Sequence, residues 1–462
     1  MSESLEASGG GPGSAGFRDD LLRSIPPLLL LAIAILLPAS LVVAHVHSYT
    51  QLSPVDELQH IDYYLRSPTV IVLGDRVQEP AMREQACRGI DAGIAVPSCD
   101  APSLSPSQFQ ETGFNTAYIH PPTYYSLTAL LSLPLRWIGL EDVTAGRLVG
   151  VLWLSLGLLL SWIAGRRLRI SAFPLAASLL LVGVMPSVVY SSSVINPDAV
   201  SLAVGAAVIL LTLEAERRTD FWRWVLLVFA AIIAIGFKSQ NLLIILCLAL
   251  YLLLRAWQNR KEMRATADSV SASSRRPILM LGMAIALGLI ALLVLEAWLK
   301  TVSYLGRGDA SAIPMNAQFK APDGFPFDVL ANSLGIFFPP SSSYFSVFLR
   351  GRVVGTGMIL TGIVLVAGCT GVGWFLTEAR PEIRALARAV TITAVLGAPF
   401  MVIANDVLLE SVFLIPPRYG LPLLPAMALC VATGTRSILG RSLLAALAVS
   451  VAGGTLAHIL VS

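Results

Sequence analysis

The chain has 462 residues, of which 55% are hydrophobic and 13% are charged, about half the charged share that is usual in soluble proteins. The net charge of +3 is too small to indicate a nucleic-acid partner. Apolar runs of about 20 residues recur along most of the chain, and runs of this length span a bilayer as helices. They do not alternate polar and apolar residues, which excludes a membrane β-barrel.

Residues 1–24 are polar and rich in Gly and Ser, which predicts a disordered tail. The apolar run from Pro27 to Val46 predicts a first span and not a cleaved signal peptide, because no small-x-small site ends it. Ten further apolar runs predict spans at about 144–164, 172–192, 199–213, 222–237, 241–257, 277–298, 351–376, 385–404, 419–435 and 440–461.

The predicted fold class is therefore an all-α, polytopic transmembrane bundle of about 11 spans. Its parts are the tail, a module at 25–300 that includes a long first loop at 47–143, a second loop at 301–350, and C-terminal helices at 351–462.

The segment from His120 to Leu140 is ambiguous, because it is apolar but carries Pro134 and Arg136. Whether it spans decides the side of everything that follows. The downstream basic clusters join Arg18 and Arg23 on one side only if the segment does not span, as the positive-inside rule favours. We therefore predict an interfacial helix, a cytoplasmic N-terminus, and both long loops outside the plasma membrane.

Five cysteines divide into two groups. Cys247, Cys369 and Cys430 fall inside predicted spans, where a small buried hydrophobe is the expected role. Cys87 and Cys99 lie in the first long loop and are a possible disulfide if that loop faces an oxidising compartment. The sequence leaves this pairing open.

The predicted spans carry almost no charge at mid-depth, where ion-coupled transporters usually need it. Polar residues gather instead in segments that are predicted to meet at the outer face. These are Asp56, Glu57 and His60 after the first span, His120, Tyr124 and Tyr125 at the interfacial segment, Asp198 after the third span, Lys238 and Gln240 after the fifth, and Arg418 and Tyr419 before the tenth.

Such a layer suits a reaction on a lipid-bound substrate. If a sugar moves from a polyprenyl-phosphate carrier to a hydroxyl group, a carboxylate can accept the hydroxyl proton, and Asp56 and Glu57 are the candidates. Adjacent helical residues point about 100° apart, so only one is expected to face the reacting centre. Lys238 and Arg418 suit the leaving phosphate.

Each of these signals also has an ordinary structural explanation. An acidic pair at a helix start can be a cap, a His-Pro-Pro run can be a chain bend, and a lone arginine can snorkel to the interface. The order of the motifs and their common side carry more weight than any one of them.

These motifs resemble those of the GT-C superfamily of membrane glycosyltransferases, which use polyprenyl-phosphate sugars, and within it a bacterial group of predicted membrane proteins of unassigned function. The resemblance is carried by Asp56-Glu57 with His60, by His120-Pro121-Pro122 with Tyr125, by Asp198, and by Arg418-Tyr419-x-Leu-Pro. It implies that Asp56 is the base. It also implies a donor site formed by His60, His120, Tyr124, Tyr125, Asp198, Lys238, Gln240, Arg418 and Tyr419.

The sequence thus predicts an inverting glycosyltransferase that moves a sugar from a polyprenyl-phosphate donor to a glycan, glycolipid or protein acceptor of the cell envelope. No cofactor is expected, although Asp56, Glu57 and Asp198 are the ligands that a divalent cation would use. A transporter or flippase of lipid-linked sugars, a non-catalytic scaffold, and a polymerase or ligase with a pyrophosphate-linked donor remain alternatives.

Overall fold

The computed structural model describes residues 25–90, 95–218, 220–265, 275–306, 308, 312–314, 325–338, 352–409 and 411–461. The predicted tail and most of the predicted second loop lie outside these residues. Within them, helices and two isolated bridges are the regular structure, and no β-strand forms. The all-α fold class is therefore confirmed.

Eight helical stretches in the described part of the chain are long and apolar enough to cross a membrane. They contain α2 (Pro27–Ser48), α6 (Asp142–Arg167), α9 (Ser201–Arg217), α11 (Leu242–Ala265), α12 (Arg275–Leu305), α16 (Arg352–Thr370), α17 (Pro381–Leu409) and α19 (Ile438–Val461). A ninth crossing is formed if α7 (Ala172–Gly183) and α8 (Pro186–Ser193), which are bent by 60°, are one span. Pro186 accounts for the bend, because proline lacks a backbone donor.

The other two predicted spans are shorter than expected. One is the 17-residue helix α10 (Phe221–Phe237). The other begins as a 3-10 segment, η8 (Pro417–Leu423), and continues as the 11-residue helix α18 (Leu424–Gly434). Prolines in η8 remove backbone donors, which favours this tighter, irregular start. Each of the eleven predicted spans contains a helix, but among the described residues eight or nine helices meet the length and composition of a full crossing.

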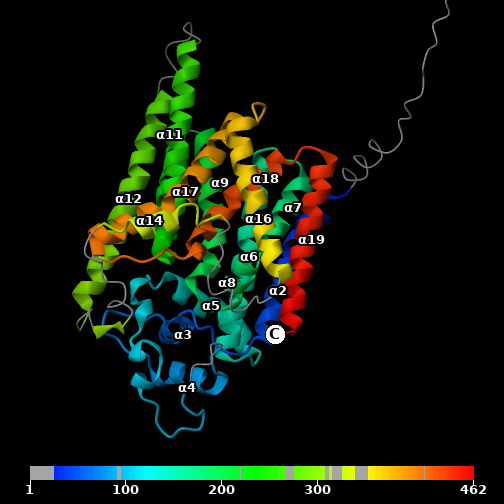
Figure 1. Ribbon diagram of the computed structural model, residues 1–462. Helices are drawn as coiled ribbons and strands as arrows, with labels where there is room; N and C mark the ends of the chain where they lie inside the picture. The colour runs from blue at the N-terminus through cyan, green and yellow to red at the C-terminus, as the bar shows by residue number, and fades with distance from the viewer. Residues whose placement is uncertain are drawn as a thin grey trace, which may run out of the picture.

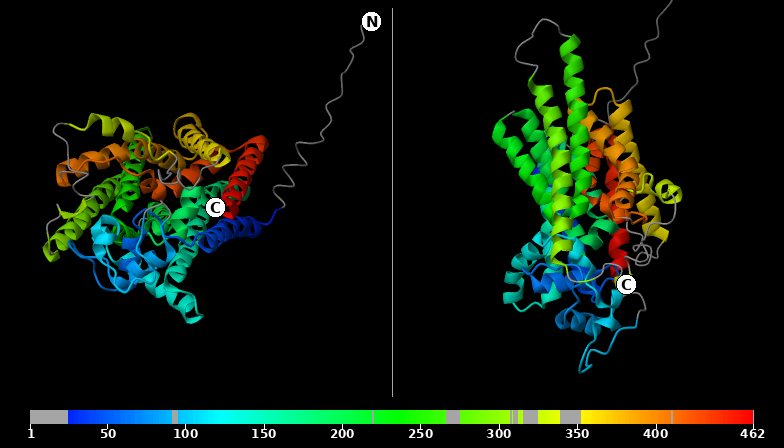
Figure 2. Two further views of the ribbon diagram at one scale, coloured as in Figure 1. Left: turned by 60° about the horizontal axis from the view of Figure 1, so that its bottom comes forward. Right: turned by 90° about the vertical axis from the view of Figure 1, so that its left-hand side faces the viewer.

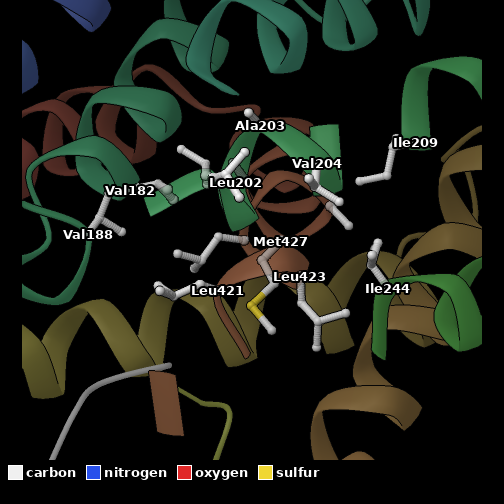
Figure 3. Packing of buried hydrophobic residues seen from close by; sticks show 14 of the residues in the cluster. Val182, Val188, Leu202, Ala203, Val204, Ile209, Ile244, Leu421, Leu423 and Met427 are labelled. Atoms are coloured by element: carbon white, nitrogen blue, oxygen red, sulfur yellow. The ribbon is translucent and has the colours of Figure 1, made fainter. Parts of the chain in front are cut away.

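The helices run side by side in one bundle, with α11 and α12 on one flank and α2 and α19 on the other (Figure 1). Helix α6 packs against α2, α5 and α9, and α11 packs against α12 and α17. Figure 3 shows the apolar contact between Leu202 of α9, Ile244 of α11, and Leu423 and Met427 of η8 and α18. This contact joins early and late parts of the chain next to the polar segments described below.

The first long loop folds into a compact layer at one end of the bundle (Figures 1 and 2). Its helices are α3 (Glu57–Arg66), α4 (Glu79–Arg88) and α5 (Thr123–Trp137), with 3-10 turns η1 (Pro106–Gln108), η2 (Gln110–Gly113) and η3 (Thr116–Ile119). Cys87 and Cys99 form a disulfide that ties the end of α4 to the chain ahead of η1. Two further short elements are α14 (Phe327–Ser333) and the π-helical turn η7 (Gly371–Phe375).

Helix α5 covers the segment that was ambiguous in the sequence. It has 15 residues, too few for a full crossing. Its Tyr124, Tyr125, Thr128 and Ser132 are buried, whereas Trp137 is 79% exposed. The helix is therefore amphipathic and packs its polar and aromatic side on α3 and α6.

Basic residues concentrate at the opposite end of the bundle. Arg167 forms an ion pair with Glu214 at 2.8 Å, and Arg276 donates to the backbone oxygen of Glu216 at 2.6 Å. Helix α2 begins at this end, whereas α19 ends near the layer that holds α3 (Figure 1).

Candidate active site

The acidic pair stands where the chain turns from α2 into α3. Asp56 is the N-cap residue of α3 and has left-handed backbone angles, φ 57° and ψ 14°. Aspartate tolerates this conformation better than most residues do. Asp56 is half-buried, whereas Glu57, the first residue of the helix, is fully buried. The turn thus gives two adjacent acids different surroundings.

The Glu57 carboxylate is part of a buried hydrogen-bond network with Arg147 of α6. Arg147 donates from Nε to Oε1 at 2.8 Å and from Nη2 to Oε2 at 2.7 Å. The backbone N–H groups of Ser53 and Ile195 also donate to this carboxylate, at 2.7 and 3.1 Å. Arg147 donates further to the backbone oxygen of Gln51 at 2.7 Å. Glu57 therefore joins the α2–α3 connection, α6 and the segment before η4.

A second buried group, here called the charge cluster, consists of Asp198, Lys238 and Arg418. Asp198 lies in the 3-10 turn η4 (Pro197–Val200), Lys238 lies between α10 and α11, and Arg418 lies in η8. Lys238 Nζ donates to Asp198 Oδ1, and Arg418 Nε lies 3.1 Å from Asp198 Oδ2. Two cations thus lie around the Asp198 carboxylate, and the Asp56 carboxylate is within electrostatic reach of both. Buried cations in this arrangement are suited to contact an anion.

A small cavity lies beside the charge cluster. Its wall is formed by Val55, Tyr190, Ser191, Val194, Asn196, Asp198 and Arg418. Val55 directly precedes Asp56, so the acidic turn and the charge cluster border the same space. Asn196 fixes the cluster side of the wall, because its side chain accepts from the Asp198 backbone N–H at 2.9 Å.

The Asp56 carboxylate makes no hydrogen bond or ion pair with the residues that the structure describes. Burial raises its pKa, and Arg418 and Lys238 oppose this increase, while Glu111 and Asp198 add to it. A carboxylate with a raised pKa and open lone pairs can accept a proton from a neighbouring hydroxyl group. This geometry favours Asp56 over Glu57 as a base.

The two predicted histidines form an aromatic wall with the predicted tyrosines. Tyr125 hydroxyl and His60 Nδ1 are 2.7 Å apart, and the rings of His60 and His120 are 5.6 Å apart between centroids. Tyr125 stacks on Tyr63 at 4.0 Å and contacts Tyr124 edge-on at 5.2 Å. Burial lowers the pKa of both histidines, and Lys238 lowers it further, so both rings are neutral near pH 7.

Tyr419 and Gln240 are the last two predicted site residues. Lys238 Nζ lies 4.8 Å from the Tyr419 ring centroid, and Arg418 Cζ lies 5.5 Å from it. Gln240 makes a side-chain hydrogen bond with Tyr419. Apart from Glu57, which faces Arg147, the structure gathers the predicted site residues around the charge cluster and its neighbouring aromatic wall.

Two residues of this region were not predicted as site residues. Arg147 anchors Glu57, and Glu111 of η2 contributes negative charge near Asp56. Arg147 had a signal in the sequence, since a charged residue in an apolar helix usually has a partner or a function. Glu111 had none, because its loop approaches Asp56 only through the tertiary fold.

The described residues contain no group of three His, Cys, Asp or Glu side chains that could hold a metal ion. Of the three acids considered as ligands, Glu57 is paired with Arg147, and Asp198 is paired with Lys238 and Arg418. The remaining acid, Asp56, is a single possible ligand.

The fold and the site define a multi-pass helical membrane protein with a buried, charged site at one end of its bundle. A family model described as "Predicted membrane protein (DUF2142)" matches residues 100–427, and the chain belongs to this family. The expected resemblance to a group of predicted membrane proteins is thereby confirmed.

No curated protein matches the chain. Among solved structures, the crystal structure of ArnT from Cupriavidus metallidurans bound to undecaprenyl phosphate is similar, with 18% identity and a TM-score of 0.43. The match covers 87% of this chain and 59% of the ArnT chain, so this chain spans about three-fifths of that structure. At this TM-score the likeness assigns no function.

Proposed function

We propose that the protein is an inverting glycosyltransferase that moves a sugar from a polyprenyl-phosphate donor to a hydroxyl acceptor of the cell envelope. The observation that carries the proposal is the Asp56 carboxylate, which pairs with none of the described residues and lies within electrostatic reach of the charge cluster. A small cavity lined by Val55, Asp198 and Arg418 adjoins this group. The resemblance of these motifs to those of the GT-C superfamily supports the same reaction.

In the proposed reaction, Asp56 accepts the proton of the acceptor hydroxyl as its oxygen forms a bond to the anomeric carbon. The bond from the anomeric carbon to the phosphate oxygen breaks, and the lipid phosphate leaves with the electron pair. A single displacement of this kind inverts the configuration. Glu57 takes no part as a base, since Arg147 and two backbone N–H groups occupy its carboxylate.

The leaving phosphate is assigned to Lys238 and Arg418. Both cations contact the Asp198 carboxylate in the cluster, and ammonium and guanidinium groups bind phosphate oxygens through charge-assisted hydrogen bonds. Burial lowers the pKa of Lys238 to about 8, although Asp198 opposes this effect, so the ammonium form predominates near pH 7. Charge stabilisation comes from these side chains, and the proposal includes no metal.

A lipid-linked donor agrees with the position of the site. Helix α5 lies beside it and turns an exposed apolar side, with Leu130 59% and Trp137 79% exposed, away from the bundle. Amphipathic helices with this pattern lie in membrane interfaces. The basic clusters that contain Arg167 and Arg276 lie at the opposite end, so the positive-inside rule supports a site on the outer face of the plasma membrane.

Binding of polyprenyl phosphate tests the phosphate assignment without knowledge of the sugar. Purified protein in nanodiscs is titrated with polyprenyl phosphate, and native mass spectrometry measures the bound fraction. Lys238→Met is expected to weaken binding roughly 10- to 100-fold, since a charge-assisted hydrogen bond contributes about 1.5–3 kcal/mol. The matched control is Lys300→Met, because Lys300 is 76% exposed and pairs with Glu296 on α12. Wild-type affinity in both Lys238→Met and Arg418→Met would overturn the assignment.

A further inference from the structure

His120 has a buried ring with an unused polar atom. The residue is 7% exposed, and its Nδ1 has no hydrogen-bond partner among the described residues. A buried polar atom without a partner destabilises the fold, because it has lost its hydrogen bonds to water. Such an atom near the charge cluster indicates a group that arrives with the ligand.

The position of the ring is fixed by its neighbours. His120 directly follows η3, where Trp298 Nε1 of α12 donates to the backbone oxygen of Ile119 at 2.9 Å. Its ring faces the ring of His60, and Lys238 and Arg418 act on it electrostatically. His60 does not satisfy His120 through Nδ1, because that nitrogen is hydrogen-bonded to the Tyr125 hydroxyl. His120 thus borders the charge cluster with one polar atom available.

The chemistry of the ring selects the kind of group it binds. A neutral imidazole nitrogen donates to or accepts from a hydroxyl group, according to its tautomer. A phosphate is better served by the neighbouring cations, Lys238 and Arg418. A sugar carried on that phosphate would present hydroxyl groups within a few ångströms of the cations.

We propose that His120 Nδ1 binds a hydroxyl group of the donor sugar, while Lys238 and Arg418 bind the phosphate of the same molecule. This inference rests on the proposed function and deepens it, because it divides one donor between a sugar subsite and a phosphate subsite. His60 acts as a positioning residue, since its ring packs beside the His120 ring, and Tyr125 holds His60 through its hydroxyl group.

The test compares two ligands that differ only in the sugar. Affinities for bare polyprenyl phosphate and for polyprenyl-phosphate arabinose, mannose, glucose and galactose are measured in nanodiscs. His120→Leu is expected to lower the affinity for the preferred sugar-bearing lipid roughly 10-fold and to leave the bare lipid unchanged. His120→Asn is expected to stay within about 3-fold of wild type, since an amide can replace Nδ1 in position and chemistry.

Controls separate the alternatives. His47→Leu changes an exposed histidine at the end of α2 and should alter neither affinity. Equal weakening of both ligands in His120→Leu would place the contact at the phosphate and overturn the proposal. If His120→Leu changes neither affinity, water satisfies Nδ1 and the proposal is contradicted. If His120→Gln restores the affinity but His120→Asn does not, the contact is at Nε2, which also contradicts the proposal. If wild type binds bare polyprenyl phosphate but none of the sugar-bearing forms, the sugar subsite alone fails. If it binds neither, the proposed function fails.

Discussion

At the scale of single residues, one backbone conformation places two adjacent acids in different surroundings. The left-handed angles of Asp56 let Glu57 begin α3 and reach Arg147 in the core, while Asp56 stays within electrostatic reach of Lys238 and Arg418. The Glu57–Arg147 pair is 0% and 1% exposed and uses both carboxylate oxygens. We expect its role to be the positioning of Asp56 relative to Asp198, because Glu57 also holds the backbone N–H of Ile195, three residues before Asp198.

Removal of one partner of this pair is expected to destabilise the fold strongly. Glu57→Gln and Arg147→Met should each lower the free energy of unfolding by about 3–5 kcal/mol, because each leaves the charge of the other partner uncompensated in the core. Thermal unfolding in detergent, followed by tryptophan fluorescence, measures the change.

The matched control for that experiment is Glu79→Gln. Glu79 pairs with Arg83 at 2.9 Å on α4, where the two side chains are 65% and 34% exposed. Exposed pairs of this kind contribute about 0–1 kcal/mol. If Glu57→Gln and Glu79→Gln have the same small effect, the Glu57–Arg147 pair does not hold this end of the fold together.

The sequence could assemble most of the candidate site but could not choose between its two acids. Asp56, Asp198, Lys238 and Arg418 were predicted to share one face because each stands at the end of an apolar run, and the structure brings them together. The choice between Asp56 and Glu57 depends on Arg147, 90 residues away in the chain, and on a positive φ angle. Neither follows from local patterns.

At the scale of helices and turns, close backbone contacts seat the segments that carry the site. A Cβ atom added to Gly205 of α9 would overlap the backbone oxygen of Pro422 in η8. A Cβ added to Gly150 of α6 would overlap the backbone oxygen of Ser192 in α8. These contacts fix η8, which carries Arg418, and α8, whose Tyr190 lines the cavity.

Gly205→Ala is therefore expected to displace η8. We predict a loss of about 1–3 kcal/mol in the free energy of unfolding, as is typical for overpacking, together with weaker binding of polyprenyl phosphate, since Arg418 moves with η8. Gly288→Ala is the control, because a Cβ at this position of α12 meets nothing within 4 Å. Unchanged lipid affinity in Gly205→Ala would show that the contact does not position Arg418.

The sequence located the helices better than it described their interruptions. The predicted spans 172–192 and 419–435 are helical, but the first is bent at Pro186 and the second starts as a 3-10 segment. Pro186 and the prolines of η8 were visible signals of both breaks. A hydropathy average does not detect such breaks, because its window is longer than a turn.

At the scale of the whole molecule, the bundle separates two kinds of surface. The layer of α3, α4 and α5 lies at one end of the bundle (Figure 1), and the basic clusters that contain Arg167 and Arg276 lie at the other end. The first-loop layer is closed by its own contacts, since Asn115 Nδ2 donates to Asp62 of α3 at 2.7 Å and the disulfide holds α4. A reaction at this end would take place beside the membrane surface, where a lipid carrier presents its phosphate.

The transfer reaction itself is the most direct test of the proposed function. Purified wild type and Asp56→Asn are given radiolabelled polyprenyl-phosphate arabinose, mannose, glucose and galactose, with envelope lipids and glycans as acceptors, with and without a chelator. We predict transfer from one donor by wild type, no effect of the chelator, and a loss of about 10²- to 10⁴-fold in Asp56→Asn, which should still bind polyprenyl phosphate. Transfer by Asp56→Asn at the wild-type rate, or no transfer from any donor by folded wild-type protein, would contradict the proposal.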